Sequence, residues 1–272
     1  LEAGNLNVAG ASGSFICMSY YFSGMKLDTV QEKIREQLKL ASSISYSLSR
    51  DFLTEFGSWI GYLKGEREIL DWSFQPVNEN DTILTVYYTV RLGIYYLFDK
   101  DILAKETLSI LERIFAKQMS MMVAPEIAFL ASLIRIRLMK KKGKKKDRTL
   151  RLYMKRLKNW SKHSPSNYRH KYLAVKGLLA ISEGKEQKGI ALLAEALQGA
   201  LDNGFIQDAA IIHETLGESF FCRGLTSLAS MHLREAYNLY LLWGAMKKAE
   251  VLAKQYGDFF TKELVENQSY KL

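Results

Sequence analysis

The chain has 272 residues, of which 48% are hydrophobic and 25% charged, and its formal net charge is +9 at pH 7. This composition is typical of a folded globular chain and excludes a disordered one, and the length allows a large buried core. Only three prolines occur in the whole chain. We therefore expect an all-α protein whose helices are joined by short connections.

Turn-forming glycines separate the helices predicted in the first third of the chain. Residues 20–38 predict the end of one helix, a turn at Gly24 and then an amphipathic helix. Residues 56–66 predict the end of a further helix, with a turn at Gly65. Both turns place glycine where a left-handed backbone is needed to end a helix.

The next predicted helix contains many residues that also favour strands. Residues 82–90 are rich in Thr, Val and Tyr, but apolar residues continue at helical spacing as far as Leu97, which predicts a helix. In the hairpin predicted over 95–114, Asp99 stands where the turn glycine is expected.

A basic tract lies between two predicted helices, 124–138 and 148–160. Lysine ammonium groups cannot be buried without losing hydration, so we expect this tract to be an exposed, solvated loop, with a basic hook for polyanions as the alternative. The loop residues are Lys140, Lys141, Lys142, Lys144, Lys145 and Lys146. The surrounding segment 135–162 carries a charge of +13, which leaves −4 for the rest of the chain and argues against a general affinity for polyanions.

The C-terminal half repeats itself with a period of 40 residues. Gly177 aligns with Gly217 and Gly257, and the other aligned pairs are Gly184 with Gly224, Ala196 with Ala236, and Gly204 with Gly244. This is the small-residue pattern of a tetratricopeptide repeat (TPR), in which two helices cross closely and a glycine ends the first. We predict an α-solenoid of about six such hairpins in one domain over 1–260, degenerate over 1–160 and clear over 161–260, followed by a tail or linker over 261–272.

Four segments resemble a known family: WSKHSPSNYRHKYLAV (160–175), NGFIQDAAIIHETLGESFFCRG (203–224), YLLWGA (240–245) and, less sharply, YYFSGMKL (20–27). They are similar to the TPR-like repeat region of large bacterial signalling proteins. In those proteins a serine/threonine-kinase-like domain and an NTPase domain precede the repeats, and GAF domains and a histidine kinase or other output domain follow. The chain departs from the family pattern at Ser161, Ser164, Tyr168 and Ala209. The resemblance implies a module and not a reaction, because the matching residues are hairpin-packing positions.

In TPR-like hairpins, one face of each first helix lines a concave groove. Counted from Gly177 and Gly217, this face consists of Lys171, Ala174, Leu178, Ile181, Ile211, Glu214, Glu218 and Phe221. The candidate binding residues are Lys171, Glu214 and Glu218, which supply charge, and Phe221, which supplies an apolar anchor. The expected ligand is a protein or peptide, or a flanking domain of the same chain. The alternative is that these charges pair with one another or face water.

The sequence indicates no catalytic residue, metal site or cofactor. Cys17 and Cys222 are far apart, and we expect both to be buried reduced thiols, which favours the cytoplasm. The four histidines lack metal-ligand spacing, and His170 is expected to pack near the start of a helix that follows a turn at Pro165 and Asn167. No phosphate-binding loop is present.

The longest apolar stretch, 83–98, is too short for a membrane span and contains Arg91. Because the chain begins with Leu1 and no signal peptide is recognisable, we expect it to be part of a larger protein.

We therefore expect a non-catalytic TPR-like interaction or regulatory module of a multidomain bacterial signalling ATPase or kinase, which couples flanking domains or binds a partner. The alternative is a stand-alone TPR adaptor for a peptide or effector. Nucleic-acid binding through 135–162 is a third hypothesis. It is disfavoured because base stacking needs exposed aromatic residues, whereas Tyr153 and Trp160 fall on an apolar stripe.

Overall fold

The computed structural model describes residues 6–43, 47–67, 81–115, 123–143 and 147–260, and within these ranges the chain is all-α, as predicted. The helices are α1 (Leu6–Phe22), α2 (Leu27–Ser43), α3 (Ser47–Leu63), α4 (Asp81–Leu97), α5 (Asp101–Phe115), α6 (Ala124–Lys142), α7 (Arg148–His163), α8 (Pro165–Ser182), α9 (Glu186–Asp202), α10 (Ile206–Phe221), α11 (Thr226–Trp243), α12 (Met246–Gln255) and a short 3₁₀ helix (Gly257–Phe259). The predicted tail 261–272 lies outside the described residues.

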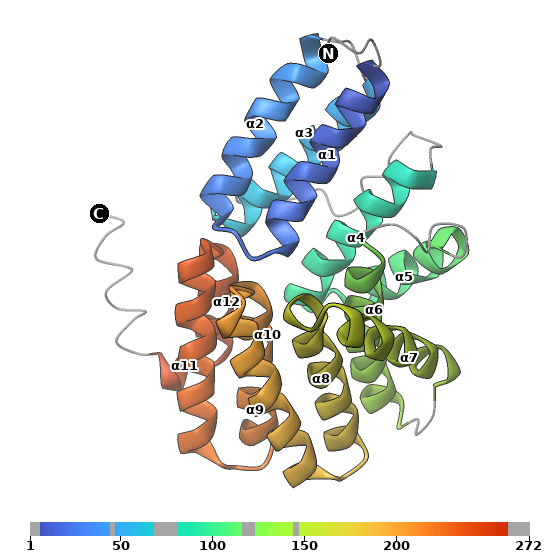
Figure 1. Ribbon diagram of the computed structural model, residues 1–272. Helices are drawn as coiled ribbons and strands as arrows, with labels where there is room; N and C mark the ends of the chain where they lie inside the picture. Colours follow the sequence, from blue (N-terminus) through green and yellow to red (C-terminus); the bar gives the residue numbers. More distant parts are fainter. Residues whose placement is uncertain (1–5, 44–46, 68–80, 116–122, 144–146, 261–272) are drawn as a thin grey trace, which may run out of the picture.

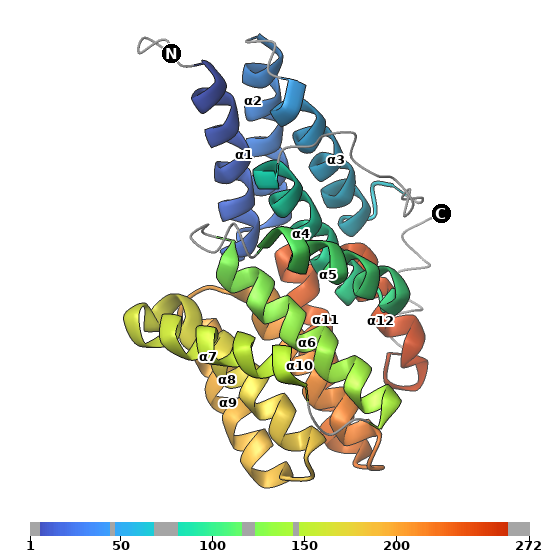
Figure 2. The ribbon, with the colours of Figure 1, turned by 90° about the vertical axis from the view of Figure 1, so that its right-hand side faces the viewer.

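The helices pack mainly as consecutive pairs (Figures 1 and 2). Five hairpins are formed by α1 with α2, α4 with α5, α6 with α7, α8 with α9, and α10 with α11. Helix α3 packs against α2 and α4, and α12 packs against α11. Most connections between consecutive helices are short, as expected from so few helix breakers, but 17 residues lie between the end of α3 and the start of α4.

The turns between helices have the left-handed backbone that the sequence predicted. Gly24, Gly65, Gly184, Gly204, Gly224 and Gly244 all have φ between +74° and +97°. Asp99 takes the same role with φ of 54° and is the only described residue other than glycine with a positive φ. Aspartate is among the few residues that tolerate this region, so the prediction that Asp99 replaces a turn glycine is confirmed.

Close crossings of helices explain the small residues of the repeat. A Cβ atom on Gly177 would lie 2.9 Å from the carbonyl oxygen of Gly189, so the two helices of the α8–α9 hairpin touch through their backbones. In the next hairpin, a Cβ on Gly217 would collide with the Leu233 side chain. The third aligned glycine, Gly257, falls in the 3₁₀ helix after α12, where the repeat pattern ends.

Helix α4 confirms the choice of helix over strand for 82–90. Its residues from Thr85 to Leu97 are all buried, and the buried Arg91 donates a hydrogen bond to the hydroxyl of Tyr87 (3.0 Å) and another to that of Tyr95.

The start of α8 differs from the prediction. We expected Pro165 to lie in a turn before the helix, but it occupies the first helical turn, where a missing N–H costs nothing.

The N-terminal hairpin meets the C-terminal helices (Figure 1). The indole Nε1 of Trp243 donates a hydrogen bond to the carbonyl oxygen of Met25 (3.1 Å), and the amide of Gln207 donates to that of Phe22 (2.7 Å). The Tyr21 and Trp243 rings are 5.5 Å apart. Helix α3 also packs against both α4 and α12. The last α-helix described therefore contacts the N-terminal helices.

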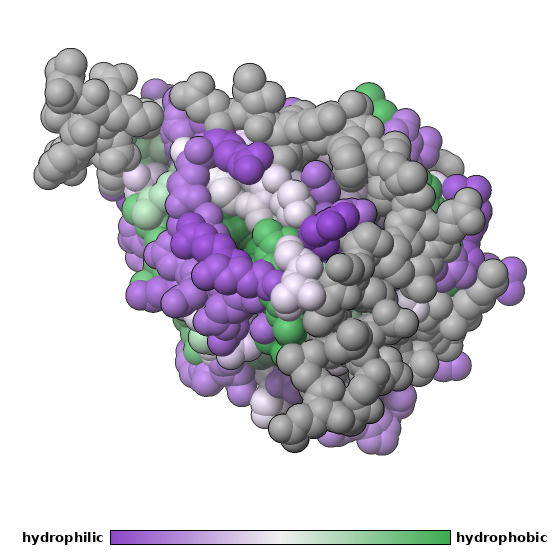
Figure 3. Space-filling model, turned by 90° about the horizontal axis from the view of Figure 1, so that it is seen from above, coloured by the Kyte–Doolittle hydropathy of each residue, from purple (hydrophilic) through white to green (hydrophobic). Residues whose placement is uncertain are grey.

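No helix in the described part of the chain is long and apolar enough to cross a membrane. Seen from the end where α1–α3 lie, the described surface is mostly hydrophilic, with hydrophobic residues exposed near its middle (Figure 3). Cys17 is buried as predicted, but Cys222 is exposed, so the prediction of a buried thiol there is wrong. Cys222 directly follows the last residue of α10, in the turn before α11, where no helix covers it.

Candidate binding groove

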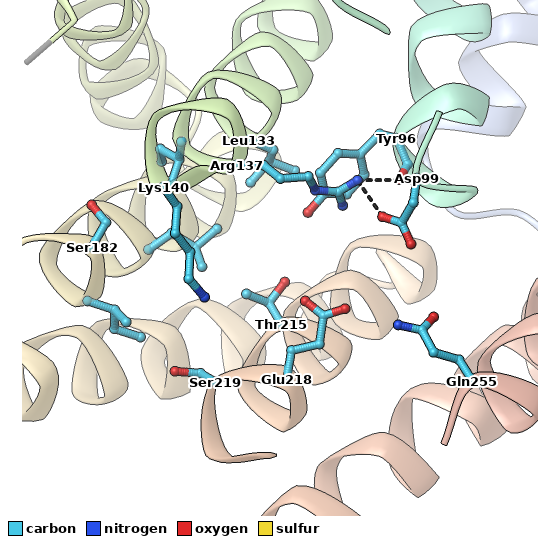
Figure 4. Close-up of a pocket in the computed structure, with 13 residues that line it drawn as sticks. Tyr96, Asp99, Leu133, Arg137, Lys140, Ser182, Thr215, Glu218, Ser219 and Gln255 are labelled. Atoms are coloured by element: carbon cyan, nitrogen blue, oxygen red, sulfur yellow. Dashed lines mark hydrogen bonds and ion pairs between the residues drawn. The ribbon is translucent and has the colours of Figure 1, made fainter. Parts of the chain in front are cut away.

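A cavity of about 670 Å³ opens between the first helices of successive hairpins, and we refer to it as the groove (Figure 4). A volume of this size accommodates a small ligand or a few residues of a peptide. Its lining residues come from α4 and the turn after it, α6, α8, α10 and α12. They are Tyr96, Asp99, Leu133, Ile136, Arg137, Lys140, Leu178, Ile181, Ser182, Thr215, Glu218, Ser219 and Gln255.

The groove residues occupy equivalent positions of the repeat. Tyr96, Arg137, Leu178 and Glu218 follow one another at intervals of 41, 41 and 40 residues, and all four line the groove. The same interval of 41 separates Asp99 from Lys140 and Lys140 from Ile181. The sequence interpretation missed Tyr96 and Arg137 because an exact 40-residue period from Leu178 falls one residue after Arg137 and two residues after Tyr96, and small residues no longer mark the repeats there.

Arg137 forms the cationic wall of the groove. Its Nη1 donates hydrogen bonds to Asp99 Oδ1 (2.6 Å) and to the carbonyl oxygen of Tyr96 (3.1 Å), and its guanidinium lies 4.1 Å from the centre of the Tyr96 ring. Burial alone would lower the pKa of Arg137, but Tyr96 and nearby carboxylates outweigh that effect and raise it. Arg137 is therefore a fixed positive charge in a rigid position.

Glu218 lies on the opposite wall, on α10. The hydroxyl of Tyr256 lies 3.4 Å from its Oε1, and no ion pair joins Glu218 to any described residue. Burial, followed by repulsion from Glu214, raises the pKa of Glu218 to about 7, although Arg137 opposes the shift. The side chains of Lys140, Glu218 and Gln255 point toward the same open space (Figure 4). Glu218 is therefore an acidic group that a cationic ligand group could reach.

Among the loop lysines whose side chains the structure describes, Lys140 lines the groove. The sequence predicted an exposed loop from Lys140 onward, but Lys140, Lys141 and Lys142 form the last turn of α6, and Gly143 caps that helix with φ of 61°. The helix continues because lysine has a good helix propensity and can extend its ammonium group into water while its backbone stays helical. Lys140 is exposed, and Lys144, Lys145 and Lys146 lie outside the described residues.

The remaining lining residues make the groove amphipathic. Leu133, Ile136, Leu178 and Ile181 supply its apolar part, and Ser182, Thr215 and Ser219 supply hydroxyl groups. An apolar lining with a few fixed polar groups is typical of sites that bind a ligand in one orientation. Neither histidine nor cysteine is among the described lining residues.

Lys171, one of the predicted groove residues, does not line the groove. Its side chain is 0% exposed, and its Nζ donates to Glu126 Oε2 (2.9 Å) and to Asp208 Oδ2 (2.5 Å). The prediction is wrong for a physical reason. Two carboxylates from α6 and α10 offset the cost of burying the ammonium group, so Lys171 joins three helices in the core.

His170 completes this buried cluster. Its Nε2 lies 2.8 Å from Asp208 Oδ2, and its ring packs 4.4 Å from that of Phe205. Burial raises the pKa of Glu126 to about 7 and lowers that of His170, whereas the carboxylates raise the pKa of Lys171 against the effect of its burial. The packing role expected for His170 thus includes a polar contact between α8 and α10.

The other two predicted groove residues differ in their surroundings. Glu214 accepts hydrogen bonds from the Tyr240 hydroxyl (2.6 Å) and from Lys248 Nζ (2.5 Å), so it joins α10 to α11 and α12 beside the groove. Phe221 is 47% exposed, and its ring centre lies 5.4 Å from that of Tyr256 at the end of α10. Of the four candidate binding residues, only Glu218 lines the groove.

The described residues contain no group of three metal-binding side chains. Fold and groove together define an all-α protein of consecutive helix pairs, with a ligand-sized groove between the first helices of several pairs. Neither a family model, nor a curated protein, nor a solved structure matched the chain.

Proposed function

We propose that the protein is a non-catalytic, TPR-like α-solenoid module that binds a segment of polypeptide in the groove. The observation that carries this proposal is the groove itself, in which equivalent positions of four successive repeats combine an apolar lining with Arg137 and Glu218 on opposite walls. An extended or helical segment lying across these helices would contact each repeat in turn.

The charges of the groove support a ligand with groups of both signs. Lys140 and Glu218 both point into the groove, and neither forms an ion pair with a described residue. A ligand carboxylate near Lys140 and a ligand ammonium or guanidinium near Glu218 would each find a partner. Polypeptide segments commonly supply both groups together with apolar side chains.

The resemblance described above supports the biological setting. We propose that the module belongs to a multidomain bacterial signalling ATPase or kinase of the cytoplasm, and that its ligand is a flanking domain of the same polypeptide or a partner that changes how flanking domains are held. A stand-alone adaptor for a peptide or effector is the second candidate, and the groove would serve it equally well.

Site-specific photo-crosslinking in the native protein tests the proposal and separates the two candidates. A benzophenone amino acid replaces Ser219 in the groove or, as a control, Ala194, which is exposed on α9 outside it. We expect crosslinks to a polypeptide from position 219 and not from 194. Mass spectrometry then shows whether the crosslinked segment belongs to the same polypeptide, as in a regulatory module, or to another one, as for an adaptor. Equal crosslinking from both positions would contradict the proposal.

A further inference from the structure

Helix α7 presents a row of cations that the groove does not use. The row consists of Arg148, Arg151, Lys155, Lys158 and Lys162, all of them exposed. Their spacing alternates between three and four residues, which places them within an arc of about 80° and along about 21 Å of the helix. They therefore form one straight line of charge on the surface, which we call the α7 row.

No described acidic residue forms an ion pair with the α7 row. Helix α7 contains no acidic residue, and it packs against α6 and α8. The only acidic residue of α6, Glu126, is buried against Lys171, and α8 has none. No ion pair joins any residue of the row to another described residue. An exposed set of like charges without counter-charges is a site of strong positive potential.

The one acidic residue in the segment 135–162 is already occupied. Asp147 Oδ2 accepts a hydrogen bond from Arg135 Nη1 (2.7 Å), and its Oδ1 accepts one from the backbone N–H of Leu150 (2.9 Å), so Asp147 caps α7. The opposite face of α7 is fixed in the core through the buried Leu150, Tyr153 and Leu157. The fold thus holds the α7 row rigid and turned to solvent.

We propose that the α7 row binds the phosphate backbone of double-stranded nucleic acid. A duplex carries one charge per about 1.7 Å of its axis, so a length of duplex equal to the 21 Å row carries about 12 phosphate charges, distributed around both strands. A straight, rigid line of cations matches a straight, rigid polyanion. Such contacts go to phosphate and carry no sequence information, so binding is independent of sequence.

Other polyanions fit the α7 row less well. Stacking on single strands needs exposed aromatic rings, and Tyr153 is buried while Trp160 is only partly exposed. This agrees with the sequence analysis, which disfavoured nucleic acid on the ground of base stacking, but backbone binding of a duplex does not require stacking. An anionic membrane is a plane, whereas the row is one helix wide, and the apolar face of α7 is buried in the core and cannot insert.

The test is fluorescence anisotropy of a labelled 20-base-pair DNA duplex titrated with the full chain at several salt concentrations. Five neutralised phosphates predict a slope of log K against log salt of about −4.5, and hence about a 500-fold loss of affinity between 50 and 200 mM salt. The row variant changes all five residues to Gln, which keeps helix propensity. We expect its affinity to fall more than about tenfold at 50 mM salt and its slope to approach zero.

A charge-matched control separates the α7 row from net charge. It replaces five other exposed cations with Gln, namely Lys26, Arg35, Lys39, Lys105 and Lys188. Each variant lowers the net charge from +9 by five. The control is expected to bind within about threefold of the parent chain. Equal losses in both variants, or full binding by the row variant, would overturn the proposal. So would binding of phosphatidylserine vesicles without binding of the duplex, which would assign the row to a membrane surface.

Discussion

Removing the ammonium group of Lys171 is the most direct test of the buried cluster. Its Nζ lies 2.9 Å from Glu126 and 2.5 Å from Asp208, with the lysine side chain 0% exposed. Lys171→Met keeps the apolar volume but leaves two carboxylates buried without their cation, which typically costs about 3–5 kcal/mol. The whole stability of a domain is about 5–15 kcal/mol, and each kcal/mol shifts the melting temperature by about 2–4 °C at this size, so we expect a fall of about 6–20 °C.

The loss should depend on pH in a definite direction. Without Lys171, burial raises the pKa values of Glu126 and Asp208 in the folded chain above those in the unfolded chain. The folded state then binds more protons than the unfolded state, so stability falls as the pH rises through this range. Lys171→Met should therefore be less destabilising at pH 5 than at pH 8.

Thermal melts followed by circular dichroism at both pH values measure the effect. The matched control is Lys176→Met on the same helix, whose side chain is half-buried and for which we expect a change within about 0.5 kcal/mol. Adding Glu126→Gln and Asp208→Asn to Lys171→Met removes the uncompensated charges and should recover much of the loss. A loss below about 1 kcal/mol, or an equal loss at both pH values, would refute the reasoning.

Three further predictions follow from the fold and the groove. Gly177→Ala should destabilise the chain by about 1–3 kcal/mol, because a Cβ there would lie 2.9 Å from a backbone oxygen of α9. Gly199→Ala, where the nearest atom is 3.6 Å away, should be neutral or stabilising in the same urea titration. Trp243→Phe removes the hydrogen bond to Met25 and should speed hydrogen exchange in α1 and α2; unchanged exchange there would contradict that role. The pKa of Glu218 is raised to about 7, so the contribution of this group to wild-type stability falls as the pH rises from about 4.5 to 7, and Glu218→Gln should remove that loss. Melts at pH 5 and pH 8 test it, and an equal difference from wild type at both values would argue against it.

Local features of the fold were predictable from the sequence because they depend on single residues. A left-handed turn requires glycine or a tolerant substitute, so Gly65 and even Asp99 could be placed from their positions alone. Helical spacing likewise identified α4, although its composition favours strands. In such cases the residues that determine the local structure lie close to one another in the sequence.

The buried cluster and the cationic wall of the groove could not be predicted in the same way. Lys171 is buried because Glu126 and Asp208, at sequence separations of 45 and 37, come together only after three helices have stacked. No local pattern distinguishes it from an exposed lysine. Arg137 precedes Leu178 by 41 residues, close to the 40-residue repeat length, so it could have been predicted only by tracing the repeat into a region where its glycines are missing.

The contact between Trp243 and Met25 joins residues 218 apart in the sequence. In an open stack each unit touches only its neighbours, so the end units fray first and strain at one unit is relieved at a free end. Here the N-terminal hairpin and the C-terminal helices contact each other, so strain cannot be relieved at a free end. A ligand that moves the groove helices apart would have to deform the packing of all the helices or separate Trp243 from Met25. Such a ligand would therefore link occupation of the groove to opening of the N-terminal hairpin.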